Sequence, residues 1–70
     1  MFMCSFSAYL FIFEKEMRKA KIQRAAGFLE EAWDTLWYIQ TEARKNNARE
    51  NFDEAARIMD EIKVEGGEGA

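Results

Sequence analysis

IQRAAGFLEEAWDTLWYIQTEA, residues 22–43, is the stretch that decides the fold. Its apolar residues recur at alternating spacings of three and four, which is the pattern of an amphipathic helix with a seam facing a neighbour. The seam consists of Ile22, Ala25, Leu29, Ala32, Leu36, Ile39 and Ala43. Phe28, Trp33, Trp37 and Tyr38 widen the apolar surface beyond what a two-helix contact needs, so more than one neighbour must cover this helix.

The pattern predicts an all-α helical hairpin, with a long central helix over about 17–46 and a shorter helix over about 52–63. The periodicity stops at Asn46-Asn47 and restarts after Asn51, which is a good N-cap with Glu54 at the matching position of a capping box. Gly27 inside the long helix indicates either a close helix crossing or a local break, because glycine is costly in a helix interior. We expect the close crossing.

Residues 1–16 form an apolar arm, and no charge precedes Glu14. The arm is too short for a membrane-spanning helix, which needs ~20 apolar residues. The charges of Glu14 and Lys15, directly after the uncharged run 1–13, argue against a cleaved signal. Its periodicity fits a strand as well as a helix, but no Pro or Gly separates it from the next helix, which favours a helical or partly irregular arm. An alternative is that Met17 is the natural start of the protein, because the residues that follow it are an ordinary opening for a helical protein.

With 70 residues, the chain has room for one domain, which we place at 1–65, followed by a flexible tail at 66–70. A core of this size usually contributes only about 3–5 kcal/mol unless something reinforces it. Cys4 is the only cysteine, so no intramolecular disulfide is available. We therefore expect a cytoplasmic homodimer with a four-helix-bundle-like arrangement, similar in outline to small plasmid and viral adaptor proteins.

Charge is distributed unevenly along the chain, although the net charge is only −3. Basic residues dominate before Glu30 and acidic residues dominate after it, which can orient an antiparallel partner. A short basic patch contains Arg18, Lys19, Lys21 and Arg24. It suggests an anionic partner such as nucleic acid, but a solvated helix face with internal ion pairs explains it better.

The chemistry of common enzyme sites is missing from the composition. There is no histidine, no nucleophile-elbow pattern and no phosphate-binding glycine loop. The carboxylates Glu30, Glu31 and Asp34 are better explained as a solvated helix face than as a metal site, because helix-bundle metal sites usually also use histidine. We expect no enzymatic activity, no cofactor and no bound metal.

Two partial resemblances were considered. The phrase Phe52-Asp-Glu-Ala-Ala, preceded by Ala32-Trp33-Asp-Thr-Leu36, resembles the paired helices of one tetratricopeptide repeat, but the intervening segment is too long for that repeat. An N-terminal run followed by two helices is similar in outline to ribbon-helix-helix DNA-binding dimers. The run lacks basic and amide side chains, so it does not match them at the residues that read bases. Neither family is assigned.

The function expected from the sequence is protein–protein interaction by a small regulator or adaptor, because tryptophan and tyrosine carry much of the energy at interfaces. The alternatives are a small structural subunit of a larger complex and a nucleic-acid-associated regulator that uses the basic patch. We expect a second copy of the chain and an unidentified protein as partners, rather than nucleic acid or a membrane. The residues predicted to bind a partner are Ile22, Phe28, Leu29, Trp33, Trp37 and Tyr38.

Overall fold

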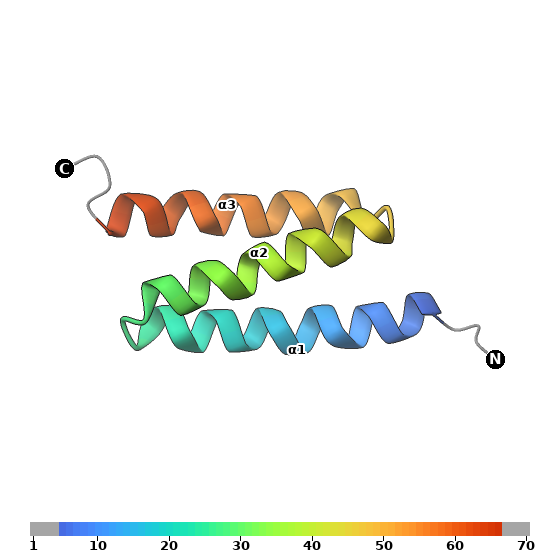
Figure 1. Ribbon diagram of the computed structural model, residues 1–70, viewed down its shortest axis with the longest axis horizontal. Coiled ribbons are helices and arrows are strands. Elements are labelled where there is room, and N and C mark those ends of the chain that lie inside the picture. The colour runs from blue at the N-terminus through green and yellow to red at the C-terminus, as the bar shows by residue number, and fades with distance from the viewer. Residues whose placement is uncertain (1–4, 67–70) are drawn as a thin grey trace.

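The computed structural model describes residues 5–66. Over this range all regular secondary structure is helical, with no strand. Three helices follow one another: α1 at Ser5–Ala25, α2 at Leu29–Lys45 and α3 at Arg49–Glu65. Figure 1 shows α2 running obliquely across the other two helices, and it packs against both of them. The all-α prediction is confirmed, and the expectation that the central helix needs two neighbours is also met.

The prediction of one long helix over 17–46 is wrong, because the chain turns at Ala26, Gly27 and Phe28. Gly27 has a φ of +90°, a conformation that glycine adopts without steric cost. The Phe28 amide donates to the Gln23 carbonyl at 2.9 Å, which closes the end of α1 in the manner of a Schellman motif. The close-crossing interpretation of Gly27 is wrong as well, since this residue is exposed and no atom lies within 4 Å of where a Cβ would be.

A second turn with the same pattern joins α2 to α3 through Asn46, Asn47 and Ala48. Asn47 has a φ of 57°, and the Ala48 amide donates to the Ala43 carbonyl at 2.8 Å. Asparagine tolerates this left-handed conformation better than most residues. Because the turn needs only three residues, α3 begins at Arg49. It ends at Glu65, so it is longer than the predicted 52–63 at both ends.

The predicted capping box at Asn51 is wrong, because Ala48 precedes the first residue of α3 and makes no side-chain cap. Asn51 lies inside the helix, where its side-chain amide donates to the Tyr9 hydroxyl at 2.8 Å. This bond links the first part of α1 to the first turn of α3. The polar side chain thus serves a tertiary contact instead of a helix start.

The apolar arm is helical from Ser5 onward and is continuous with the rest of α1, in line with the preferred alternative. Its residues 1–4, like residues 67–70 of the predicted tail, lie outside the described part of the chain. Tyr9, Met17 and Ala20 are buried, and Phe13 packs against the core, so the inward side of α1 follows helical spacing from Tyr9 to Ala20. No helix within residues 5–66 is both long and apolar enough to cross a membrane.

The core is formed where α2 meets its two neighbours. From α2 it takes Ala32, Leu36 and Ile39, each at most 2% exposed. The remaining buried members of this cluster are Met17 and Ala20 from α1, and Ala55, Ile58, Met59 and Ile62 from α3. The predicted seam is therefore confirmed from Ala32 onward. It fails at Ile22 and Ala25, which are exposed because the turn at Gly27 separates them from α2.

Candidate functional site

The six residues predicted to bind a partner do not form one patch. Ile22 lies on α1 and Phe28 in the first turn, and these side chains are 63% and 58% exposed. The other four lie on α2, where Trp37 is 60% exposed and Tyr38 is 42% exposed. Leu29 and Trp33 are partly buried and pack against the core. The structure therefore concentrates the candidate site on α2, while Ile22 belongs to α1 and Phe28 to the turn that precedes α2.

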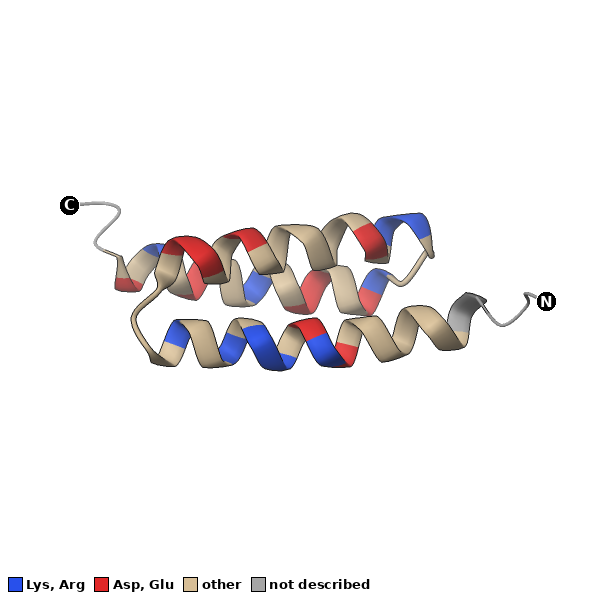
Figure 2. Ribbon diagram, turned by 60° about the horizontal axis from the view of Figure 1, so that its bottom comes forward, with Lys and Arg blue, Asp and Glu red and all other residues tan. Residues whose placement is uncertain are grey.

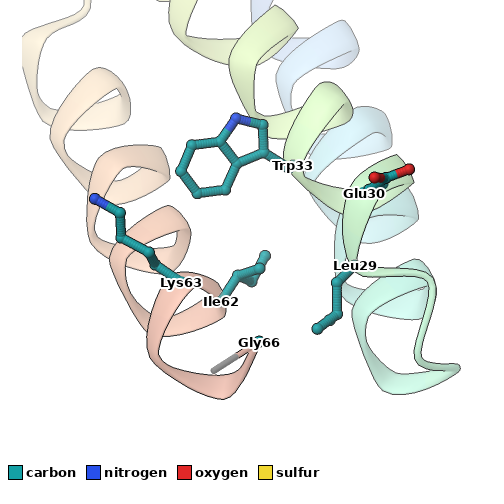
Figure 3. Close-up of a pocket in the computed structure, with 6 residues that line it drawn as sticks. All are labelled: Leu29, Glu30, Trp33, Ile62, Lys63 and Gly66. Carbon is teal, nitrogen blue, oxygen red and sulfur yellow. The ribbon is translucent and has the colours of Figure 1, made fainter. Parts of the chain in front are cut away.

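A hollow of about 300 Å³ lies between the start of α2 and the end of α3. Figure 3 shows the indole of Trp33 reaching from α2 toward α3, with the side chains of Leu29 and Ile62 below it. Lys63 lines the same hollow from α3, and Gly66 forms its floor without a side chain. Glu30 lines the hollow from α2, and the rest of the lining is largely apolar. The hollow therefore suits an aliphatic or aromatic side chain with a polar group at its rim.

A second hollow of about 120 Å³ lies nearer the other end of the same two helices. Trp37 and Arg44 line it from α2, and Phe52 lines it from α3. The Arg44 guanidinium carbon lies 5.8 Å from the centre of the Phe52 ring, within the range of a cation–π interaction. Thr41, also in the lining, donates its hydroxyl hydrogen to the Trp37 carbonyl at 3.1 Å.

The two hollows belong to one side of α2. Four of their α2 lining residues follow one another at intervals of four, four and seven, which places them on one stripe of a helix. We refer to this surface as the α2–α3 groove. It is lined by Leu29, Trp33, Trp37, Arg44, Phe52, Ile62 and Lys63.

Figure 2 shows the basic residues of α1 along its second half, and the ion pairs divide them between different partners. Arg24 faces α3, where its Nη1 lies 2.9 Å from a carboxylate oxygen of Glu61 and its other nitrogens bind Glu65 in a bidentate pair. Lys19 pairs with Glu16 at 3.3 Å on α1. Among residues 5–66, no ion pair engages Arg18 or Lys21, and both are exposed.

The Arg24 cluster also changes the acidity of its own members. Hydrogen bonding from Arg24 holds the pKa of Glu65 below its ordinary value of 4.5. The same bonds, first with Glu65 and then with Glu61, raise the pKa of the Arg24 side chain. The cluster is therefore a charged link between α1 and α3, and its guanidinium is already occupied by two carboxylates.

Carboxylates elsewhere do not gather into a metal-binding group. Over the described residues, no three Asp, Glu, Cys or His side chains lie close enough to hold an ion. Every buried side-chain nitrogen or oxygen in the same range has a hydrogen-bond partner. Thr35 is the buried polar residue of the core, and it donates to the Gln23 side chain at 2.7 Å. Such satisfied groups act as structural contacts.

The groove contains residues that sequence reasoning did not assign to a site. Phe52 and Ile62 were predicted on the packing face of the second helix, and Arg44 had no assigned role. The sequence did contain a signal for Arg44. Trp33, Trp37 and Arg44 follow Leu29 at helical intervals, so they lie on the same side of α2. Their partners on α3 depend on the position of the second turn, which the sequence pattern misplaced by three residues.

No protein-family model matches the chain, and comparisons with curated proteins and with solved structures found no match. What the surface binds must therefore follow from its own shape and chemistry.

Proposed function

We propose that this chain is a non-enzymatic protein-interaction module, a small regulator or adaptor that binds another protein through the α2–α3 groove. The observation that carries the proposal is the position of the two tryptophans. Both line an open groove between α2 and α3, where Trp33 packs against the core on one side and Trp37 is 60% exposed. An exposed large aromatic side chain beside an apolar hollow is typical of binding surfaces.

The groove favours an amphipathic helix of the partner protein. Its two hollows lie along one helix–helix junction and accept apolar side chains spaced along one face, as in other helix-in-groove complexes. Arg44 is the charged residue that lines the second hollow, whereas Lys63 shares the lining of the first hollow with Glu30. The partner helix should therefore carry apolar anchors with acidic residues beside them.

We further propose that the module acts in the cytoplasm and as a homodimer. A single cysteine is in keeping with a reducing compartment, where disulfides are rare. A short chain with a small core also gains stability from association. The alternative of nucleic-acid binding has less support, because Arg24 is held by Glu61 and Glu65 and Lys19 by Glu16.

The proposal is tested by site-specific photo-crosslinking in the source cell. A photoreactive amino acid replaces Gln40, which lines the second hollow, and the control position is Arg57, which is exposed on α3 and does not line the groove. Mass spectrometry should identify a partner helix crosslinked at position 40 and absent at position 57. Equal labelling at both positions, or none at position 40, would contradict the groove.

The charge of the partner is tested in the same experiment. The variants Arg44→Glu and Lys63→Glu should each weaken crosslinking from position 40, because each places a carboxylate beside the acidic residues of the partner helix. The matched control is Arg57→Glu, which reverses a charge on the same module outside the groove. Undiminished crosslinking in both groove variants would show that the partner helix is not acidic. A partner that copurifies in fixed proportion with a chain that aggregates alone would instead indicate a structural subunit.

A further inference from the structure

The side of α2 that faces away from the core has an unusual arrangement of residues. We call it the outer face of α2, and it consists of Glu30, Asp34, Trp37, Tyr38, Thr41 and Lys45. All are exposed except Thr41, which is half-buried. On a helix these positions share one face, opposite to Leu36 and Ile39 in the core. Figure 1 shows α2 running obliquely between α1 and α3.

The spacings along this face are four, three, one, three and four, so the pattern is symmetric about the peptide bond between Trp37 and Tyr38. A symmetric pattern on a helix is self-complementary when a second identical helix lies antiparallel to it. In that arrangement, a residue that precedes the centre in one copy lies beside the residue of the other copy that follows the centre by the same number of positions. Trp37 meets Tyr38, Asp34 meets Thr41 and Glu30 meets Lys45.

We propose that a second copy of this chain docks on the outer face of α2, with the two α2 helices antiparallel about a two-fold axis at Trp37 and Tyr38. Each of the three contacts occurs twice by symmetry. At the centre, two exposed indoles and two exposed phenol rings become covered together. The apolar centre with a polar rim is the usual anatomy of a protein interface.

The polar contacts at the rim are complementary in charge and hydrogen bonding. Glu30 of one copy faces Lys45 of the other, and the Asp34 carboxylate accepts a hydrogen bond from the Thr41 hydroxyl of the other copy once that hydroxyl turns away from the Trp37 carbonyl of its own helix. Within one copy, Lys45 makes only an exposed pair with Glu42 at 3.4 Å, so its ammonium group has donors left for Glu30. Antiparallel pairing also places the negative end of one helix dipole beside the positive end of the other.

The outer faces of the other two helices fit a second copy less well. On α1 the exposed stripe of Phe11, Lys15, Arg18 and Ile22 is also symmetric, but antiparallel pairing would place Lys15 against Arg18. On α3 the corresponding stripe has Arg57 and Asp60 at its centre and no aromatic residue, and Arg57 already pairs with Glu61 at 3.3 Å. Of the three helices, α2 alone combines an aromatic centre with opposite charges at its ends.

This inference rests on the proposed function in one respect, because it takes the exposed aromatic residues of α2 to serve association. It specifies the face and register of the proposed homodimer, and that face shares Trp37 and Thr41 with the second hollow of the groove. The experiments are therefore chosen so that dimerisation and binding of another protein can fail separately. Photo-crosslinking at position 40 reports another protein in the cell. The experiments below use the purified full chain alone and report only self-association.

Sedimentation and light scattering over a micromolar to millimolar concentration series test the dimer. One helix face is smaller than a standard interface, so we expect a reversible dimer with a dissociation constant that is roughly micromolar. Glu30→Lys and Lys45→Glu should each weaken it at least tenfold, since each creates two like-charge contacts. The double variant should restore the dimer. A wild-type chain that stays monomeric at millimolar concentration, or a double variant no tighter than the single variants, would overturn the proposal.

Disulfide trapping tests the register. In a Cys4→Ser background, Asp34→Cys and Thr41→Cys chains are mixed and oxidised mildly, with circular dichroism confirming that each is folded. Antiparallel pairing places position 34 beside position 41, whereas two copies of position 34 are separated by about 10 Å along the helix, beyond the span of a disulfide. Crosslinks should therefore form between unlike chains. Crosslinks that form equally between like chains would overturn the register.

Discussion

The two sides of α2 differ in what kind of residue they carry. The inward side consists of alanine, leucine and isoleucine, and Ala32, Leu36 and Ala43 are completely buried. The outward side carries Trp37 and Tyr38, the larger side chains, and leaves them exposed. Small and branched residues on this side allow α1 and α3 to approach α2 closely, so the core is closed without Trp37 and Tyr38. The inward side of α2 therefore serves folding, and the outward side serves association. Four substitutions test this division and the contacts that position α2.

Leu36→Ala should have the largest effect, because it removes the largest completely buried group on the inward side of α2. Such truncations cost about 2–5 kcal/mol, while a core of this size contributes only about 3–5 kcal/mol. The variant should therefore be largely unfolded at physiological temperature, as measured by far-ultraviolet circular dichroism during thermal melting. A melting curve like that of the wild type would show that association, and not this core, supplies most of the stability.

Trp37→Ala should have the opposite profile on the outward side. We expect helix content at high dilution to stay close to that of the wild type, because exposed substitutions usually change stability by no more than about 0.5 kcal/mol. Self-association should weaken at least tenfold in sedimentation, since the substitution removes both central tryptophans of the dimer. If helix content and association fall together, Trp37 belongs to the fold and the separation of the two sides is wrong.

Gly27→Ala tests how α2 is positioned relative to α1. The φ of +90° at this residue strains any side chain, so we expect a loss of about 1–2 kcal/mol in the free energy of unfolding by denaturant titration. Asn47→Gly is the matched control at the equivalent position of the second turn, where glycine is tolerated and the change should be close to zero. Equal losses in both variants would mean that backbone conformation does not explain the first turn.

Glu65→Gln should have the smallest effect, because its contact with Arg24 is largely exposed to solvent. Arg24 holds the pKa of Glu65 below 4.5 in the folded chain, so the ionised carboxylate stabilises the fold above that ordinary value and the contribution disappears as pH falls through the lowered pKa. The variant should melt slightly below the wild type at neutral pH and together with it in strong acid. Asp60→Asn, also exposed on α3, should show no such convergence.

The sequence was sufficient to predict the helical class and the inward side of α2, because Ala32, Leu36 and Ile39 repeat at the spacing of a buried helix face. It was not sufficient to predict the first turn. The same spacing continues through Ile22 and Ala25, so periodicity alone does not distinguish a straight helix from two helices joined at Gly27. Only the left-handed backbone at Gly27, together with the hydrogen bond from Phe28 to Gln23, decides between them.

The candidate site was predicted only in part, because the first turn was not predicted. Trp33 and Trp37 were assigned to partner binding from residue type, and the groove retains both. Ile22 and Phe28 were joined to them by the assumption of one long helix, and the turn places these two residues on other elements. Phe52 and Ile62 complete the groove from α3, and their position depends on tertiary packing that no local pattern records.

The matching turns at Gly27 and Asn47 also bear on how quickly the chain folds. Each joins neighbouring helices through three residues, so most tertiary contacts link segments that are close in sequence. Chains with such local contacts lose little entropy on closing their loops and fold within about microseconds to milliseconds. Since α2 is shared by both hairpins, either hairpin can form first and then serve as the surface on which the remaining helix docks.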